Sequence, residues 1–384
     1  MYNILRNRGE NMDEWIEHPQ ILKNIKFTLS LLSSVINETV PLQPDFQPDW
    51  NFIHSFTKKH NVDNTVFYAI EQLNNKPEPQ LYKNWKNNRN KCVHRNMIQR
   101  QEFSAICSAF EQNDIDFMPV KGFDVSSLYP IEAARYMSDL DILIRQDRDK
   151  AGDILLEMGY TIKKHDIDYD MPFTKPPFMV VELHNNLFPM HSPYRSYFDE
   201  VFLRCTNTGH QYSLNVEDFY IYEIVHLFKH HSDGGTGIRS MMDFYLINNT
   251  VLPKADTEKI RNELDNLGLL DFSNLIGFIA DKWFRRNDFD SFSEDETFIL
   301  SSGTYGTATH SVMQNVSNST KSQYVKNRLF PPKNNMLEYF PKLRKRPYLL
   351  PFYYIYRLIR GLFCRNQKVI NEYKIIKANK KPRS

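Results

Sequence analysis

The chain has 384 residues, enough to bury a substantial core in about two or three structural units. A hydrophobic fraction of 41% with 24% charged residues excludes an intrinsically disordered chain and indicates a folded one. The formal net charge of +2 is too small to indicate nucleic-acid binding by the molecule as a whole.

The four cysteines lie singly in the sequence, without the CxxC spacing of a structural zinc site or the pattern of a disulfide framework. We therefore expect reduced thiols. The first residues hold no apolar run of signal-peptide length, and no stretch approaches the roughly 18 uncharged apolar residues of a membrane span. These observations predict a cytoplasmic protein.

The hydrophobic pattern divides the chain into four parts. Near the start, Ile21, Ile25, Leu29 and Leu32 recur at helical spacing, and helical spacing returns after Val216. Between them, short β-like runs such as LDILI and FMVVEL alternate with helical stretches. We predict an α+β fold in which a small mixed sheet with helices is embedded between N- and C-terminal helical segments. The expected parts are a helical segment at 1–109, an α/β core at 110–210, a helical domain at 211–340 and a basic amphipathic tail at 341–384.

The run SDLDILI places two carboxylates on one face of a predicted strand. Side chains two residues apart point the same way, so Asp139 and Asp141 share a face while Leu140 and Ile142 point into the core. Such a pair is costly without a cation, and Mg²⁺ takes oxygen ligands of this kind together with substrate phosphates. Taken alone, the pattern more often means two acids on an exposed strand edge.

Two further features support a site. The apolar run IDFMPV ends in Lys121 and Gly122 at a helix start, where glycine lets a ligand approach the backbone and the lysine adds positive charge for a triphosphate. Downstream, Glu182 interrupts the otherwise apolar run FMVVEL. Taken alone, this glutamate fits equally well as a strand-end residue that faces water.

In this order, these motifs resemble the bacterial uncharacterised nucleotidyltransferase family and, more broadly, the DNA polymerase beta superfamily of nucleotidyltransferases. Similar helical flanks extend the likeness over most of the chain. The chain departs from the superfamily in having Lys-Gly where Gly-Ser is usual, and in a longer gap between that turn and the Asp pair. The motifs that carry the resemblance are Lys121-Gly122, Arg135, Asp139-Leu140-Asp141, Gly159-Tyr160 and Glu182-Leu183-His184.

The resemblance implies a nucleotidyltransferase-type sheet and a Mg²⁺-dependent reaction. A nucleoside monophosphate would pass from a nucleoside triphosphate such as ATP to an acceptor, with release of pyrophosphate. Two Mg²⁺ ions, or Mn²⁺ in their place, would be held by Asp139, Asp141 and Glu182, and Glu182 would help to deprotonate the acceptor. The expected nucleotide contacts are Lys121, Gly122, Arg135 and Arg239, although Arg135 also fits as a solvated loop residue.

A histidine-containing helix follows the predicted sheet. His226 and His230 lie four residues apart and share a helix face. The helix lacks the glutamate of the HExxH signature, which disfavours a zinc site. His226 and Asp243 also fit as buried hydrogen-bonding residues that orient the helices. We favour Arg239, after a glycine-rich loop, as a phosphate or base contact.

Several functions remain open from the sequence. The acceptor could be a small metabolite, a sugar or lipid precursor, a peptide or an RNA end. A non-catalytic nucleotide-binding module is disfavoured, because it would have no physical reason to keep three clustered acids. A toxin-type nucleotidyltransferase that acts on tRNA would need an extensive basic groove, and in the sequence only the tail is strongly basic.

The tail contains a predicted basic amphipathic helix. Its apolar residues recur at helical steps after Pro351, and its arginines lie on the flank or the opposite side. We expect this helix to dock on the protein's own helical domain, and the alternative is weak contact with an anionic membrane surface. The uncharged run is too short to span a bilayer. The apolar residues are Phe352, Ile355, Tyr356, Ile359 and Phe363.

Overall fold

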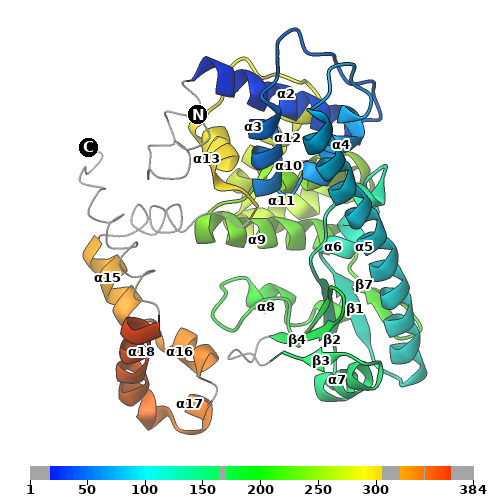
Figure 1. The fold of residues 1–384 in the computed structure, drawn as a ribbon. Coiled ribbons are helices and arrows are strands. Elements are labelled where there is room, and N and C mark those ends of the chain that lie inside the picture. Colours follow the sequence, from blue (N-terminus) through cyan, green and yellow to red (C-terminus); the bar gives the residue numbers. More distant parts are fainter. Residues whose placement is uncertain (1–17, 164–169, 305–320, 341, 365–384) are drawn as a thin grey trace.

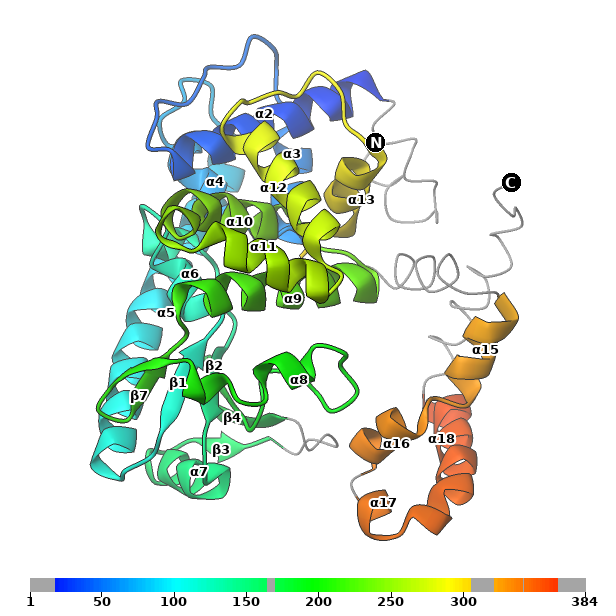
Figure 2. The ribbon, with the colours of Figure 1, turned by 180° about the vertical axis from the view of Figure 1, so that it is seen from behind.

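The computed structural model describes residues 18–163, 170–304, 321–340 and 342–364. Figure 1 shows a layer of helices at the top, a sheet with its covering helices beneath it, and a smaller group of helices at the side. Figure 2 shows the same three parts from behind. The predicted α+β fold with a mixed sheet is therefore confirmed.

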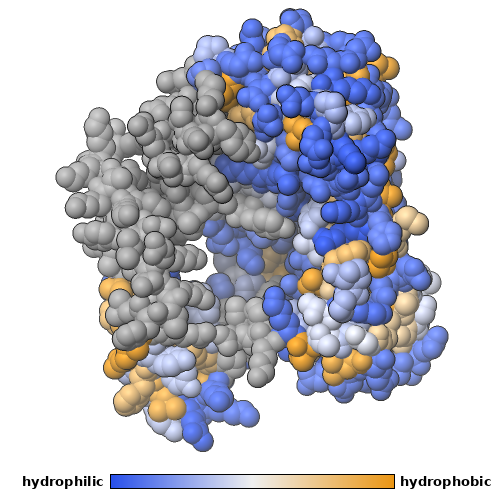
Figure 3. All heavy atoms as spheres, viewed as in Figure 1, coloured by the Kyte–Doolittle hydropathy of each residue, from blue (hydrophilic) through white to orange (hydrophobic). Residues whose placement is uncertain are grey.

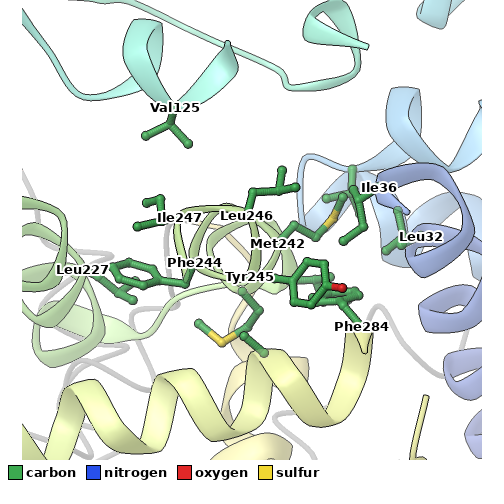
Figure 4. Packing of buried hydrophobic residues seen from close by; sticks show 14 of the residues in the cluster. Leu32, Ile36, Val125, Leu227, Met242, Phe244, Tyr245, Leu246, Ile247 and Phe284 are labelled. Carbon is green, nitrogen blue, oxygen red and sulfur yellow. The ribbon is translucent and has the colours of Figure 1, made fainter. Parts of the chain in front are cut away.

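The upper helices share a single hydrophobic core to which segments before and after the sheet both contribute. In Figure 4, Phe244 of α10 points toward Leu227 of α9, and Met242 of α10 lies beside Ile36 of α2. The two helical segments that the sequence predicts separately therefore pack together. These helices are α2 (Pro19–Ile36), α3 (Trp50–Lys59), α4 (Asp63–Ile70), α9 (Val216–Gly234), α10 (Ile238–Thr250), η3 (Leu252–Lys254), α11 (Thr257–Asn266), α12 (Leu270–Phe284) and α13 (Glu294–Ser302).

Side-chain caps fix where several of these helices begin. Ser293 and Glu296 form a capping box at the start of α13. Asp49 accepts a hydrogen bond from the Phe52 N–H at the start of α3, and Asn215 does the same for Asp218 at the start of α9. The caps satisfy backbone donors that the first helical turn leaves without partners.

The sheet has seven strands in the order β3-β4-β5-β2-β1-β7-β6. β2 and β5 are parallel, and β1 and β4 run antiparallel to them on either side. Two strands far apart in sequence therefore lie next to each other at the centre. The strands are β1 (Phe117–Val120), β2 (Leu140–Ile144), β3 (Thr161–Ile162), β4 (Asp170–Lys175), β5 (Met179–His184), β6 (Thr206–Thr208) and β7 (Gln211–Ser213).

Both faces of the central strands are covered. Leu140 and Ile142 pack with residues of α5 (Pro79–Gln112) and α7 (Arg148–Glu157), as their alternation predicts. Leu143 points the other way and belongs to the helical core. Asp141 shares this second face, so it lies between the sheet and the helical layer. The short elements α6 (Gly122–Ser126), η1 (Glu132–Ala134), α8 (Arg195–Phe198) and η2 (Val201–Leu203) connect the strands.

The basic tail belongs to a separate helical group, which Figure 1 shows at the side of the molecule. α18 packs on the segment before it: the Tyr354 hydroxyl donates to the Pro331 carbonyl at 2.6 Å, and Tyr353 contacts the Phe340 ring. The expected docking of the tail helix on the helical domain predicted at 211–340 therefore takes place, among the described residues, at the end of that domain. The group consists of α15 (Lys321–Leu329), α16 (Lys333–Tyr339), α17 (Lys342–Lys345), η4 (Pro347–Leu349) and α18 (Leu350–Cys364).

Much of the apolar face of α18 is exposed. Phe352 is 67% exposed, Ile355 56% and Ile359 50%. The side chain of Phe363 lies outside the described residues. Figure 3 shows apolar residues gathered on this helical group. Within the described ranges, none of the helices combines the length and the apolar character that crossing a bilayer requires.

Candidate functional site

The site begins with two carboxylates on the neighbouring parallel strands β2 and β5. Asp141 of β2 stands directly opposite Glu182 of β5. Because paired residues of adjacent strands point to the same face, both side chains face the helical layer. His184 shares this face two residues further along β5. Ligand atoms of Asp141, Glu182 and His184 all lie within 4.8 Å of one another.

Asp141 is the most heavily engaged carboxylate of the site. Its Oδ1 accepts a hydrogen bond from the Lys121 ammonium at 2.6 Å and lies 2.8 Å from His184 Nε2. Burial alone would raise the pKa of Asp141, but Lys121 and His184 together bring this pKa well below its ordinary value. The Asp141 carboxylate is therefore held ionised inside the protein.

The other two acids of the site have the opposite tendency. Asp139 lies just before β2, where its Oδ1 accepts a hydrogen bond from Ser138. Burial, followed by repulsion from Asp141, raises the pKa of Asp139. Burial and repulsion from Asp141 and Asp139 likewise raise the pKa of Glu182 to about 7. Three acids that repel one another on one buried face favour a cation among them.

Lys121 reaches Asp141 from a turn between β1 and α6. This turn was predicted from the sequence. Lys121 has φ 64°, a left-handed conformation that favours glycine and costs on the order of 1–3 kcal/mol for other residues. The next residue, Gly122, lies so close to Arg135 that an added Cβ would stand 2.9 Å from its Nη1. The missing side chain of Gly122 therefore leaves space for the Arg135 guanidinium. The sequence had predicted that it would leave space for a ligand.

Arg135 is buried in an ion pair. Its Nε and Nη2 donate to the two carboxylate oxygens of Asp243 at 2.8 and 3.0 Å, and its Nη1 donates to the Gly122 carbonyl at 3.2 Å. The Tyr129 hydroxyl donates to the same carboxylate at 2.6 Å. Asp243 thus has the buried orienting role that the sequence allowed. The network ties α10 to the Lys121 turn.

A small cavity of about 80 Å³ lies between this turn and the helices α9 and α10. His226 and His230 of α9 line it, with their Nε2 atoms 3.1 Å apart, as the helical spacing predicted. Burial lowers the pKa of both rings, to about 4 for His230, so both are neutral near pH 7. The cavity is also lined by Lys121, Arg135, Glu223, Arg239 and Asp243.

Three polar side-chain atoms at this cavity are buried without a hydrogen-bond partner among the described residues: Oε1 of Glu223, Oγ1 of Thr304 and Nε of Arg239. The Nη1 of Arg239 donates to the Tyr136 carbonyl at 3.2 Å. Burial raises the pKa of Glu223 to about 8. Because orphaned buried polar atoms are uncommon in folded proteins, they indicate that the cavity accommodates a polar ligand.

The donor atoms fit a divalent metal. Carboxylates of Asp141 and Glu182 and the imidazole of His184 form the group whose ligand atoms converge. Asp139, the third acid, is near enough for Asp141 to raise its pKa but is not part of this converging group. Carboxylate oxygens suit Mg²⁺ and Mn²⁺, and an imidazole suits Mn²⁺ better than Mg²⁺. His184 was part of a sequence motif but was not predicted as a ligand. Its position two residues after Glu182 was the signal for it.

An α+β fold with acids clustered across two parallel strands, beside a cation-lined cavity, is the arrangement expected of a nucleotidyltransferase. The chain belongs to the uncharacterised nucleotidyltransferase family, whose model matches residues 47–285. The match includes the whole sheet, the histidine-containing α9 and most of the helical core. No curated protein and no solved structure matches the chain. The family therefore supports nucleotidyl transfer as the class of activity of this chain.

Proposed function

We propose that the protein is a Mg²⁺-dependent nucleotidyltransferase that transfers a nucleoside monophosphate from a nucleoside triphosphate to an acceptor hydroxyl. The observation that carries this proposal is the register of Asp141 against Glu182, with Asp139 beside them. Asp139, Asp141 and Glu182 would hold the metal, with Mn²⁺ able to replace Mg²⁺, and His184 would complete or orient this set. When bound, the metal neutralises charge on the attacking and leaving oxygens.

The chain's own residues would carry out the rest of the reaction. Glu182 takes the proton of the acceptor hydroxyl, whose oxygen then bonds to the α-phosphorus of the nucleotide. The bond from that phosphorus to the bridging oxygen breaks, and pyrophosphate leaves. Lys121 lies 2.6 Å from Asp141, so its ammonium is close enough to the metal ligands to offset charge on the leaving group.

We place the triphosphate at the cavity beside Lys121. Lys121 and Arg239 supply positive charge there, and Arg239 has an Nε without a partner. Arg135 and Gly122 also line the cavity, but the guanidinium is engaged by Asp243. Their role in nucleotide binding is therefore to fix the turn that carries Lys121. ATP is our first candidate among the nucleotides.

Incubation of the purified protein with each α-labelled nucleoside triphosphate and a cell extract tests the proposal. We expect a labelled product with Mg²⁺ that is absent with EDTA. The control is Asp141→Asn, which should form no product. Nucleotide binding without any product, with metal and extract present, would favour a non-catalytic nucleotide-binding module.

The proposal extends to where the protein works. Free thiols at Cys92, Cys107 and Cys205 support a reducing compartment such as the cytoplasm. The exposed apolar residues of α18, beside the exposed cations Arg344 and Arg346, support weak contact with an anionic membrane surface.

A further inference from the structure

A second and larger hollow is lined by Tyr136, whose backbone carbonyl accepts a hydrogen bond from Arg239 of the smaller cavity. It is an open groove of about 760 Å³ between the end of α3 and the first half of α5, and Tyr136 and Phe178 close it toward the sheet. Figure 1 shows α5 running along the side of the molecule past both the helical layer and the sheet. The groove therefore connects the two parts between which the carboxylates lie.

The groove is positively charged. Lys58, Lys91 and Arg95 line it, and none of them has an ion-pair partner among the residues that the structure describes. Its remaining lining is rich in asparagine, and its one acid, Asp63, receives a hydrogen bond from Asn88 at 3.4 Å. Over residues 79–101, α5 contains six Lys or Arg residues and no Asp or Glu. A basic surface with amide side chains suits a phosphodiester backbone.

Aromatic rings stand at the end of the groove nearest the site. The Arg95 guanidinium lies 5.2 Å from the Tyr136 ring centre and 4.7 Å from that of Phe178, and its Nη1 donates to the Tyr136 hydroxyl at 2.6 Å. Rings and guanidinium planes of this kind stack on unpaired bases. The groove thus combines the two features that bind single-stranded nucleic acid.

The same end of the groove adjoins the catalytic carboxylates. Tyr136 is three residues before Asp139, and Phe178 directly precedes β5. Because β2 and β5 are parallel, both rings lie at the edge of the sheet where these strands begin. The Tyr136 carbonyl also accepts a hydrogen bond from Arg239, which lines the nucleotide cavity. The end of a chain bound in the groove would therefore lie near the start of the two strands that carry the carboxylates.

We infer that this groove binds single-stranded nucleic acid and presents its terminal hydroxyl as the acceptor. The inference rests on the proposed nucleotidyl transfer and names the acceptor of the same site. The near-zero net charge of the chain gives no indication of this basic groove, because acids elsewhere in the chain offset the cations of α5. Action on RNA requires a basic groove, which the sequence alone did not indicate. The groove along α5 meets this requirement.

Binding is tested by fluorescence anisotropy with a labelled single-stranded RNA of mixed sequence, across a salt series. We expect Lys58→Gln/Lys91→Gln to weaken binding by about tenfold at 0.1 M salt and to lower the salt slope by roughly 1.4, about 0.7 for each phosphate contact. The control is Lys23→Gln/Lys254→Gln, which removes two exposed lysines outside the groove and should bind as the unaltered protein does. Equal affinities of the two double variants would overturn the inference.

A second arm separates this inference from the proposed function. An RNA with a free 3′ hydroxyl should gain label from an α-labelled nucleotide, and the same RNA with a 3′-deoxy end should not. Labelling of a small molecule alone would support nucleotidyl transfer and overturn the RNA acceptor. Groove-dependent RNA binding without transfer to any acceptor would support the groove and overturn the proposed function. If a single-stranded DNA were labelled as well as the RNA, the groove would recognise the phosphodiester backbone and not the ribose 2′ hydroxyl, which would still support binding of single-stranded nucleic acid.

Discussion

At the scale of single residues, the two aspartates of the sequence motif are not equivalent. Asp141 accepts hydrogen bonds inside the protein and is held ionised, whereas burial and the neighbouring charge raise the pKa of Asp139. The sequence alone treats them as a matched pair whose repulsion either substitution would relieve. The contacts of Lys121 and His184, which no spacing rule predicts, make the difference.

We therefore predict opposite effects of two substitutions on the metal-free protein. Asp139→Asn should raise the melting temperature slightly, because it removes a buried repulsion. Asp141→Asn should lower the melting temperature by several degrees, because it leaves the Lys121 ammonium without its 2.6 Å partner. Both variants should lose at least about 100-fold in turnover, roughly 3 kcal/mol of transition-state stabilisation. Calorimetry without metal is the measurement, and melting shifts of equal sign would contradict the assignment.

The buried Glu223 predicts a pH dependence of stability. Arg135, Asp243, Asp124 and Lys121 are the charged groups around it, and burial raises its pKa from 4.5 to about 8. A carboxyl that holds its proton more tightly in the folded state loses stability as the pH rises from its unfolded pKa to its folded pKa.

Between pH 6.5 and 9, the melting temperature of the unaltered protein should fall by a few degrees more than that of Glu223→Gln. The pKa of Asp124 is raised to about 6, so that residue has largely titrated below this window. Thermal denaturation of both proteins across the window is the measurement. Parallel curves would show that Glu223 is already ionised near neutral pH.

At the scale of elements, strands with strong apolar runs were predictable one by one, whereas residues 1–109 were predicted to be helical without the bounds of the individual helices. LDILI and FMVVEL predicted β2 and β5. Gly159, with φ 86°, follows the end of α7 in a conformation that favours glycine. α5 is 34 residues long but has only four buried residues, so its apolar stripe is too sparse to mark one continuous helix. The basic groove was missed for this reason.

The face of the sheet that carries the candidate site was predictable only in part. Alternation places Asp139 and Asp141 on one side of β2, but the parallel pairing of β2 with β5 joins residues about 40 positions apart. Local patterns contain no information about such a pairing. The interrupted apolar run indicated Glu182, and the family resemblance gave it a role as a metal ligand. Alternation along β5 could have indicated His184, two residues further on.

The exposed face of α18 predicts an interaction with membranes. The full-length protein should co-sediment with vesicles that contain phosphatidylserine at low salt. It should dissociate at about 0.5 M salt, because salt screens the attraction between the basic residues and the anionic lipids. Phe352→Ser/Ile355→Ser should reduce this binding without a change in melting temperature, since both side chains are exposed. If the double variant instead melted earlier, the helix would be packed against the protein in solution.

At the scale of the whole molecule, the sheet and the helical layer depend on each other. Met118, Val120 and Leu143 of the central strands belong to the same core as the helices that precede and follow the sheet in the sequence. The division into four consecutive parts that the sequence predicts describes the order of elements along the chain, but the core crosses its boundaries.

It follows that residues 110–210 should not fold alone. A fragment of this range would expose the apolar face of β1 and β2 that the helices cover, so we expect it to aggregate or to remain unstructured. The intact protein should show one main unfolding transition that far-UV and near-UV circular dichroism report together. A stable, cooperatively folding fragment would contradict this dependence.

The most direct test of nucleotidyl transfer at Asp141 and Glu182 compares the fates of the α- and γ-phosphates of the same nucleotide. The purified protein is given its acceptor, or a cell extract that contains it, with ATP labelled at either the α- or the γ-phosphate, in parallel with Asp141→Asn. We predict that the α-label enters the acceptor, that the γ-label appears in pyrophosphate, and that the variant does neither. Transfer of the γ-label to the acceptor, or an active Asp141→Asn protein, would contradict the account.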